Sequence, residues 1–290
     1  MEKSNCDICA APMSKPFIRY DQNTLPCRVS ICMNCVLVKL NPRWNESKYK
    51  RFYSEKYDFF YRGPDKSVGE LFDIDLASKG KKMKERLQDI SIPNKIKMLD
   101  IGAGTGFSFF SLPASAQLES YAIEASSKCL PFLKSKGVSI IGRYFSCDFG
   151  EEYDLIVARH VLEHVLNPIS FLTKIRNSLK KEGYLYIVVP NAMFFNEKKA
   201  HSFFRHVHTY YYNLKTLLQI CKISGLYAIR SGQDGELWAI MQRKNAPDYS
   251  IPEVSLNEQF KVLKEYVRHS HQPLKRRIRS ILRRIYYRAL

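Results

Sequence analysis

The nine residues Met98-Leu99-Asp100-Ile101-Gly102-Ala103-Gly104-Thr105-Gly106 (MLDIGAGTG) decide the fold of this chain. They join a short apolar run to three glycines at alternate positions. A glycine turn between a strand and a helix lets a ligand approach the backbone closely, next to the helix N-terminus. The spacing is G-x-G-x-G rather than the G-x-G-x-x-G of dinucleotide-binding turns. The stretch therefore predicts a ligand site at the end of a strand and leaves open what the glycines hold.

Strand and helix signals alternate around this turn. Apolar runs predict strands at 96–101, 119–124, 138–141, 153–158, 184–189, 226–231 and 237–243. Helical spacing predicts helices at 68–88, 127–136 and 168–180. Such alternation is typical of a parallel sheet with helices on both faces. We therefore predict an α/β domain at 95–243 with a seven-stranded, mostly parallel sheet.

The rest of the chain divides into three segments by composition. Residues 1–45 are rich in cysteine, residues 46–94 are polar and aromatic, and residues 244–290 begin as a loop and end in a basic stretch. We predict a zinc-binding module at 1–45, a helical and aromatic linker at 46–94 that caps the substrate, and a basic amphipathic tail at 244–290.

The overall composition is that of a globular protein with an acidic partner. Hydrophobic residues make up 45% of the 290 residues, and the formal net charge is +18. No apolar run reaches the roughly 18 residues of a membrane-spanning helix, and the start MEKSNCDICA lacks the apolar stretch of a secretory signal. We therefore expect a cytoplasmic protein whose cysteines are thiols or metal ligands rather than disulfides.

Four of the cysteines have the spacing of a zinc site. Cys6 and Cys9 form one C-x2-C pair, and Cys32 and Cys35 form another. Four thiolates from two such pairs suit tetrahedral zinc. Because a short polar segment buries little core, the metal would supply its folding free energy. Four free thiols are the alternative.

Four motifs resemble those of the class I S-adenosylmethionine-dependent methyltransferases. They are LDIGAGTG (99–106), YAIEAS (121–126), YDLIVARHVLEHVLNP (153–168) and GYLYIVVPN (183–191), in the family's order. The resemblance covers residues 95–243 and implies a Rossmann-like domain whose glycine turn holds the methionine part of S-adenosylmethionine. An α/β domain that binds another nucleotide is the alternative.

The resemblance also implies roles for single residues. Glu124 would bind the ribose, because a carboxylate accepts hydrogen bonds from both hydroxyls. Phe145 and Ser146 are candidates for the adenine contact. The implied cofactor residues are Asp100, Gly102, Ala103, Gly104, Gly106, Glu124, Ala125, Arg159 and His160.

The N-terminal segment narrows the resemblance. ICMNCVLVKLNPRW followed by YKRFYSEKYDFFY is similar to the zinc-binding front end of methyltransferases that modify sugars of bacterial surface glycans and antibiotics. The resemblance implies that the zinc is structural. It also implies that the zinc helps to shape the acceptor site, together with tyrosines such as Tyr57 and Tyr61.

The histidines of this chain are the candidates for the catalytic base. Methyl transfer to a hydroxyl needs an aligned acceptor and removal of its proton, and histidine is the usual base near neutral pH. We predict that His208 is the base, supported by His206 and Tyr210, in a loop that follows a predicted strand. The alternative is that these histidines only hydrogen-bond the loop. The sequence favours a structural role for His164.

The same loop bears on the kind of methylation. It resembles the pattern of sugar C-methyltransferases, in which a Glu stands between two histidines, but this chain has Val207 there. The long C-terminal domain of that group is also not found after residue 243. Both departures favour O-methylation of a sugar hydroxyl over C-methylation.

The C-terminal stretch 274–290 combines apolar residues at helical spacing with arginines on the remaining faces. This pattern is typical of a helix that lies on an anionic membrane surface. Such a helix would suit a peripheral enzyme that modifies a lipid-linked glycan on the inner face of the membrane. Packing on the domain or on a partner protein, and nucleic-acid binding, are the alternatives.

The sequence as a whole predicts an S-adenosylmethionine-dependent methyltransferase with structural zinc. Its expected acceptor is a hydroxyl of a bacterial surface glycan or of the lipid-linked precursor. Three alternatives stay open. They are an RNA methyltransferase, which the net charge fits, a sugar C-methyltransferase, and a scaffold that binds cofactor or nucleic acid without catalysis.

Overall fold

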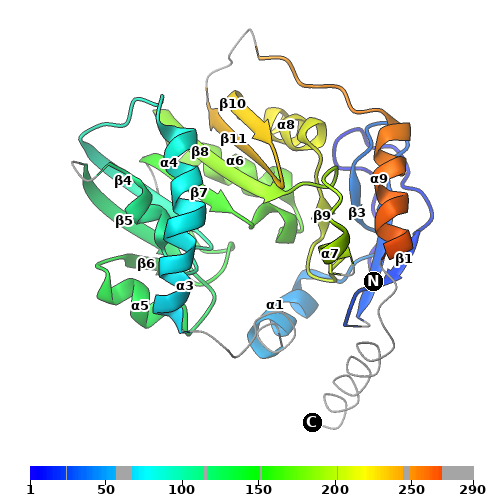
Figure 1. Ribbon diagram of the computed structural model, residues 1–290, viewed down its shortest axis with the longest axis horizontal. Helices are drawn as coiled ribbons and strands as arrows, with labels where there is room; N and C mark the ends of the chain where they lie inside the picture. The colour runs from blue at the N-terminus through cyan, green and yellow to red at the C-terminus, as the bar shows by residue number, and fades with distance from the viewer. Residues whose placement is uncertain are drawn as a thin grey trace.

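A computed structural model describes residues 1–23, 25–56, 67–113, 116–150, 152–200, 202–243 and 249–269. The basic stretch 274–290 lies outside the described residues, and so do Tyr57 and Tyr61. The described chain forms two sheets joined by helices (Figure 1).

The larger sheet has seven strands in the order β10-β11-β8-β7-β4-β5-β6. The strands are β4 (Lys95–Ile101), β5 (Gln117–Ile123), β6 (Ser139–Gly142), β7 (Tyr153–Arg159), β8 (Leu179–Pro190), β10 (Tyr227–Gln233) and β11 (Glu236–Gln242). From β6 to β8 the neighbours pair in parallel, whereas β11 runs antiparallel to β8 and β10. This topology confirms the predicted seven-stranded, mostly parallel sheet.

Helices cover both faces of this sheet. One face carries α3 (Val68–Asp75), a π-helical turn (Leu76–Gly80), α4 (Lys81–Leu87) and α5 (Cys129–Ser135); the other carries α6 (Pro168–Ser178) and α8 (Leu214–Ile223). Successive residues of β4 alternate between the two cores, so that Met98 lies in the same core as Met83 while Leu99 lies in the same core as Leu172. This alternation follows from the period of two of a strand, and it makes the strands apolar on both faces.

The smaller sheet combines three N-terminal strands with one strand from far along the chain. Its antiparallel strands β1 (Ile18–Tyr20), β2 (Pro26–Ile31), β3 (Val38–Leu40) and β9 (Tyr210–Tyr211) lie in that order. Helix α9 (Leu256–His269) lies beside it (Figure 1), with Leu263 and Tyr266 in the same core as Val29. The cysteine-rich segment is therefore completed by residues from far along the chain.

Helix α1 (Glu46–Glu55) lies between the two sheets in Figure 1. It begins at Asn45, whose side chain accepts a hydrogen bond from the backbone N–H of Lys48 at 3.2 Å. The hydroxyl of Tyr49 donates to the carbonyl of His206 at 3.1 Å, which ties the helix to the loop before β9. This contact fixes α1 over the end of the larger sheet.

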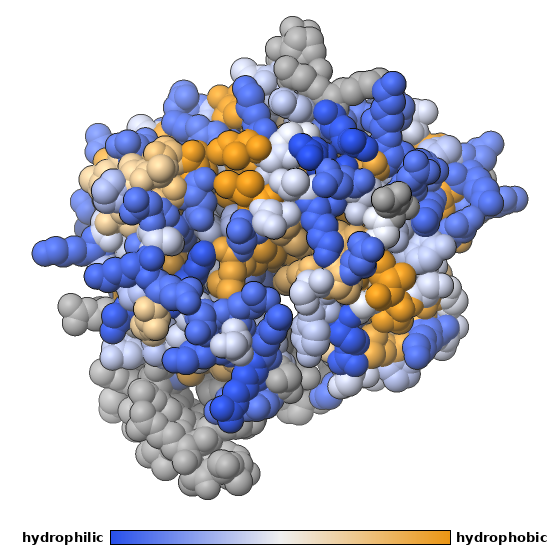
Figure 2. All heavy atoms as spheres, turned by 180° about the vertical axis from the view of Figure 1, so that it is seen from behind, coloured by the Kyte–Doolittle hydropathy of each residue, from blue (hydrophilic) through white to orange (hydrophobic). Residues whose placement is uncertain are grey.

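The surface of the described residues mixes hydrophilic and apolar side chains. On the face shown in Figure 2, hydrophilic residues surround and separate the apolar areas. The exposed large apolar side chains include Phe110, Phe194 and Ile223, which belong to different segments. No helix among the described residues has the length and apolar character needed to cross a membrane.

Candidate active site

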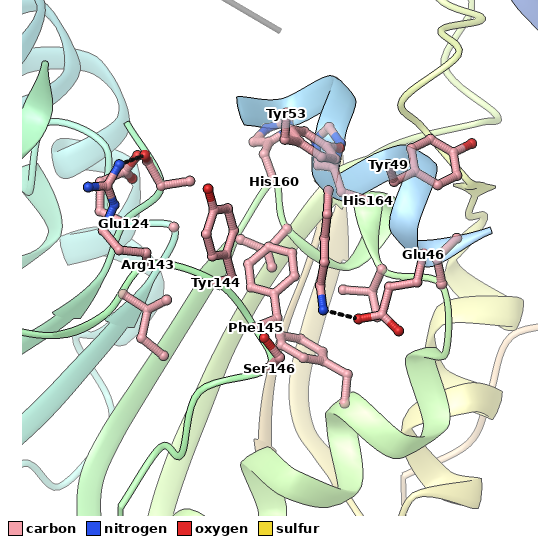
Figure 3. A pocket seen from close by; sticks show the side chains of 18 of the residues that line it. Glu46, Tyr49, Tyr53, Glu124, Arg143, Tyr144, Phe145, Ser146, His160 and His164 are labelled. Carbon is pink, nitrogen blue, oxygen red and sulfur yellow. Dashed lines mark hydrogen bonds and ion pairs between the residues drawn. The ribbon is translucent and has the colours of Figure 1, made fainter. Parts of the chain in front are cut away.

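A cavity of about 670 Å³ opens beside the carboxyl ends of the parallel strands. Its lining comes from the segments that follow β4, β5, β6 and β7 and from α1. Ligands of open α/β sheets bind at this end, and the volume is in the range of small-molecule sites. Figure 3 shows Glu124 and Arg143 on one side and Glu46 and Tyr49 on the other.

The glycine turn after β4 forms one wall of the cavity. Gly102, Gly104 and Gly106 have φ values of 72°, 55° and 76°, which side chains rarely adopt. A Cβ on Gly102 would lie 2.8 Å from Val161, whereas at Gly104 the nearest atom is 3.9 Å away. Both Gly102 and Gly104 line the cavity. The open space at Gly104 is therefore room for a ligand against bare backbone.

Glu124 closes the same wall from the end of β5. Its carboxylate accepts hydrogen bonds from the backbone N–H groups of Gly104 at 2.7 Å and Ser126 at 2.6 Å. The residue is only 4% exposed, and it lines the cavity together with Ala125. The glycine turn and the carboxylate are thus held together as one unit.

Asp100, Ala103 and Gly106 support this wall from behind, since they do not line the cavity. Burial raises the pKa of the Asp100 carboxyl to about 7, although a hydrogen bond from the Ser108 hydroxyl acts in the opposite direction. Ala103 is in the core with α4 and α5. Gly106 begins the short 3-10 helix Phe107–Ser111.

His160 stands directly after β7, between two carboxylates. Its Nδ1 lies 3.1 Å from Glu163 Oε1 and its Nε2 lies 2.8 Å from Glu236 Oε1. Burial acts to lower the pKa of His160, but the two carboxylates outweigh it and raise the pKa. Both ring nitrogens thus face carboxylate oxygens, and the ring lines the cavity.

Arg159 points from the end of β7 toward β11. Its guanidinium pairs with Glu236, and it does not line the cavity. Burial acts to raise the pKa of Glu236, but His160 and Arg159 outweigh it and hold the pKa at about 2. The sequence analysis singled out neither Glu236 nor Glu163. Glu163 lies inside the quoted motif YDLIVARHVLEHVLNP, whereas Glu236 opens a late strand and has no local signal.

His164 is the second imidazole on the cavity wall. It ends the 3-10 turn Leu162–His164, and its Nδ1 lies 3.0 Å from both the Val207 carbonyl and the Tyr53 hydroxyl. In Figure 3 its side chain lies beside Tyr53 and His160. Burial lowers the pKa of His164, so the ring is neutral near pH 7. The sequence favoured a structural role for this residue, but the structure places it at the cavity.

The three predicted catalytic residues lie behind this wall rather than on it. His208 packs against His164 with ring centroids 4.9 Å apart, and burial lowers its pKa well below the usual range. His206 contacts the Pro26 carbonyl through Nδ1. The hydroxyl of Tyr210 accepts a hydrogen bond from Arg43 at 3.0 Å.

The side of the cavity opposite the glycine turn is aromatic and polar. Helix α1 contributes Glu46, Tyr49, Lys50 and Tyr53 to it. Phe145 lies between Glu124 and His164 in Figure 3, and both Phe145 and Ser146 line the cavity. The cavity therefore has a backbone-lined end and an end with imidazole and phenol groups.

The four N-terminal cysteines form a second cluster, away from the cavity. Their sulfurs lie within 4.8 Å of one another, with Cys6 and Cys35 3.2 Å apart and Cys9 and Cys32 3.4 Å apart. The buried ammonium of Lys39 pairs with Asp7 at 2.7 Å and so holds the first cysteine loop against β3. The two C-x2-C pairs predicted to act together thus meet in space.

Comparisons with known proteins agree with this architecture. A family model described as a methyltransferase domain matches residues 76–231, which is more than half of the chain. No curated protein sequence matches the chain.

Three solved structures illustrate the similarity. The methyltransferase complexed with the Trm112 activator of Haloferax volcanii has 14% identity and a TM-score of 0.46, over 59% of this chain and 97% of that chain. The mitomycin 7-O-methyltransferase MmcR has 15% identity and a TM-score of 0.47, over 68% of this chain and 66% of that chain. An S-adenosylmethionine-dependent methyltransferase of Thermotoga maritima has 14% identity and a TM-score of 0.49, over 66% of this chain and 100% of that chain.

These TM-scores are all below 0.5, so the assignment depends on the family model and on the sheet and glycine turn described above. The match of that model begins in the π-helical turn before β4 and ends within β10, and so includes every residue of the backbone-lined wall. The chain belongs to the methyltransferase domain family and is an S-adenosylmethionine-dependent methyltransferase.

Proposed function

We propose that this methyltransferase transfers a methyl group to a hydroxyl oxygen of a sugar, in a bacterial surface glycan or its lipid-linked precursor. The observation that carries the proposal is the single cavity. One end of it is built from Gly104 and Glu124, and the other from His164 and the tyrosines of α1. Donor and acceptor can therefore meet in one cavity, and alignment of the two is the main requirement of an in-line displacement.

The residues of the first end fit S-adenosylmethionine. The cofactor, when bound, supplies an electrophilic methyl group on a sulfonium. Gly102 and Gly104 would lie against its amino-acid part, and Glu124 would take its ribose hydroxyls. Phe145 and Ser146 line the adjoining part of the cavity, where they can contact the adenine. Arg143 also lines the cavity on this side, beside Glu124.

The residues of the other end fit a sugar. Tyr49 and Tyr53 offer aromatic surface with a polar tip, a combination that suits rings with both apolar faces and hydroxyl groups. His164 supplies a neutral imidazole beside them. With His208 and Glu163 it forms a cluster that helps the acceptor hydroxyl to lose its proton, the step that a hydroxyl acceptor requires.

We also propose a structural Zn²⁺ bound by Cys6, Cys9, Cys32 and Cys35. Four thiolates around Zn²⁺ at about 2.3 Å place the sulfurs roughly 3.8 Å apart, close to the spacing of the cluster. The site joins the first loop of the chain to the turn between β2 and β3. We expect metal analysis of the purified protein to find zinc, and to lose it in a Cys32→Ser variant.

An RNA acceptor is the second candidate, and the net charge of +18 favours it. C-methylation is less well supported, because Val207 is buried against Phe52 and offers no carboxylate. A helix at 274–290 that contacts an anionic membrane remains part of the proposal and is supported by the sequence pattern alone.

The test supplies methyl-labelled S-adenosylmethionine to the full chain with an extract of the cells that make it. The extract is then separated into lipid-linked glycan, nucleotide sugar, RNA and protein. Label in the glycolipid or nucleotide-sugar fraction supports the proposal. Label in RNA, or in no fraction while the cofactor binds, contradicts it in favour of the RNA enzyme or the scaffold.

A further inference from the structure

The three side chains that form the cluster at the acceptor end of the cavity also have the residue types of a metal site. Glu163 and His164 come from the 3-10 turn after β7, and His208 comes from the loop before β9. One potential ligand atom from each lies within 4.8 Å of the others. Glu163 is 1% exposed and His208 is 9% exposed, whereas His164 reaches the cavity.

Glu163 has an oxygen without a hydrogen-bond donor. Its Oε1 accepts from His160, but its Oε2 is buried and has no partner among the described residues. A buried carboxylate oxygen left unpaired costs about 1–3 kcal/mol or more, because it has given up its hydration. The orphaned oxygen therefore indicates that a cationic or proton-donating ligand belongs beside it.

His164 offers a lone pair near the Glu163 carboxylate. Its Nδ1 faces the Val207 carbonyl, which can only accept, so Nδ1 carries the proton and Nε2 carries the lone pair. Nε2 lies 3.8 Å from Glu163 Oε1. Two acceptors at this distance do not hydrogen-bond to each other, but both can bind one cation.

His208 supplies the third donor atom. Its ring packs against His164, with the two ring centroids 4.9 Å apart. One of its ring nitrogens, one Glu163 oxygen and one His164 nitrogen lie within 4.8 Å of one another.

The backbone holds this arrangement in place before any ligand arrives. Thr209 donates from its backbone N–H to the Glu163 carbonyl at 2.7 Å, and its hydroxyl contacts the carbonyls of Glu163 and Val165. These contacts tie the loop that carries His208 to the turn that carries Glu163 and His164. Rigid placement of donors in this way is what a metal site requires.

We propose that Glu163, His164 and His208 bind a divalent transition-metal cation at the acceptor end of the cavity. Two imidazoles and one carboxylate form a donor set that suits Zn²⁺, Mn²⁺, Fe²⁺ or Co²⁺ and leaves a coordination position open. This site is separate from the four cysteines. It is held by side chains of the methyltransferase domain alone.

The role of the cation rests on the proposed function. An acceptor hydroxyl bound to the cation loses its proton to solvent more readily, because the cation stabilises the alkoxide. The alkoxide oxygen then forms a bond to the methyl carbon while the carbon–sulfur bond breaks. The electron pair of that bond stays on sulfur, which becomes a neutral thioether.

The test adds Co²⁺, as a spectroscopic probe for both proposed metal sites, to the metal-free full chain. Thiolate ligands give Co²⁺ an intense charge-transfer absorption, whereas nitrogen and oxygen ligands give only weak visible bands. We expect one equivalent with the thiolate absorption and a second equivalent without it. The variants Glu163→Gln and His208→Gln should bind the second equivalent at least about tenfold more weakly.

The control is Asp89→Asn, which removes an exposed carboxylate paired with Arg230 and should leave both equivalents unchanged. The thiolate absorption reports in each variant that the N-terminal sheet is intact. Absence of a second equivalent in the unaltered protein, or its survival in both variants, would overturn the site. Because binding is measured without acceptor, this result is independent of which molecule is methylated.

Discussion

The carboxylate of Glu124 accepts a hydrogen bond from the backbone N–H of Gly104 at 2.7 Å, so the end of β5 is tied directly to the glycine turn after β4. Two chain segments that both face the cofactor end of the cavity are thus positioned by one interaction. A change in either residue should therefore affect cofactor binding more than it affects the rest of the fold.

The first prediction concerns Glu124→Gln. The amide has the shape of the carboxylate but lacks its charge, so charge-assisted hydrogen bonds worth about 1.5–3 kcal/mol are weakened. We expect the affinity for S-adenosylmethionine, measured by calorimetry, to fall roughly 10- to 100-fold. Glu119→Gln, an exposed residue of the same strand, is the matched control and should bind normally. Equal affinities of the two variants would contradict the assigned ribose site.

The second prediction separates two glycines of the turn. A Cβ at Gly106 would lie 2.5 Å from Leu133 in the core, whereas a Cβ at Gly104 meets open cavity. Both residues have positive φ, so Gly104→Ala should cost about 1 kcal/mol and Gly106→Ala about 2–4 kcal/mol in free energy of unfolding.

Cofactor binding should follow the opposite order for these two variants. The new methyl group in Gly104→Ala occupies ligand space, so the affinity of this variant for S-adenosylmethionine should fall at least tenfold. A refolded Gly106→Ala protein should lose less affinity. Urea unfolding and calorimetry on both proteins check this. A Gly104→Ala protein that binds as well as the unaltered chain would show that the cofactor does not approach this backbone.

The third prediction concerns His164→Gln. The side chain lines the cavity beside Tyr53, whose hydroxyl lies 3.0 Å from its Nδ1. We expect the rate of methyl transfer to fall by about 10²–10⁴, the usual contribution of a group that assists proton removal. The Kd for S-adenosylmethionine should change less than about threefold. A variant that retains its turnover would show that the cluster with His208 serves the structure only.

The fourth prediction is a pH dependence of stability that comes from His206. Burial lowers its pKa to about 4 in the folded chain, against about 6.5 when unfolded. Below pH 6.5 the unfolded chain binds a proton that the folded chain does not, so the free energy of unfolding falls as the pH falls toward 4. At pH 5 this one residue should cost about 2 kcal/mol relative to pH 7.

The measurement compares urea unfolding of the unaltered chain and His206→Gln at the two pH values. The other buried histidines titrate in both proteins, so the difference between the two slopes isolates His206. We expect the variant to lose less stability on acidification. Parallel pH profiles would mean that the ring is not held neutral between Trp44 and Pro26.

Most of the larger sheet could be predicted from the sequence because its strands are long and apolar. Runs such as YDLIVA and YLYIVV are buried on both faces and stand out against their surroundings. By contrast, β1, β3 and β9 have only two or three residues each, too few to show a period. Their pairing depends on contacts between distant parts of the chain, which no local pattern records.

The candidate site also has a part that could be predicted from the sequence and a part that could not. The turn around Gly104 and the carboxylate of Glu124 belong to local motifs, and the structure brings both to the cavity. The spacing of His206 and His208 could not reveal that the loop before β9 turns inward, behind His164. Glu236 was missed because its role depends on β11 lying beside β8, a tertiary relationship.

Strand β9 closes the edge of a sheet whose other three strands are made first. As the chain leaves the ribosome, β3 emerges early, whereas Tyr210 and Tyr211 are added only after most of the protein has been synthesised. During that interval the N–H and C=O groups of β3 have no neighbour on one side. The nascent chain therefore has an open sheet edge during most of its translation. This edge can pair wrongly with another nascent chain on the same polysome.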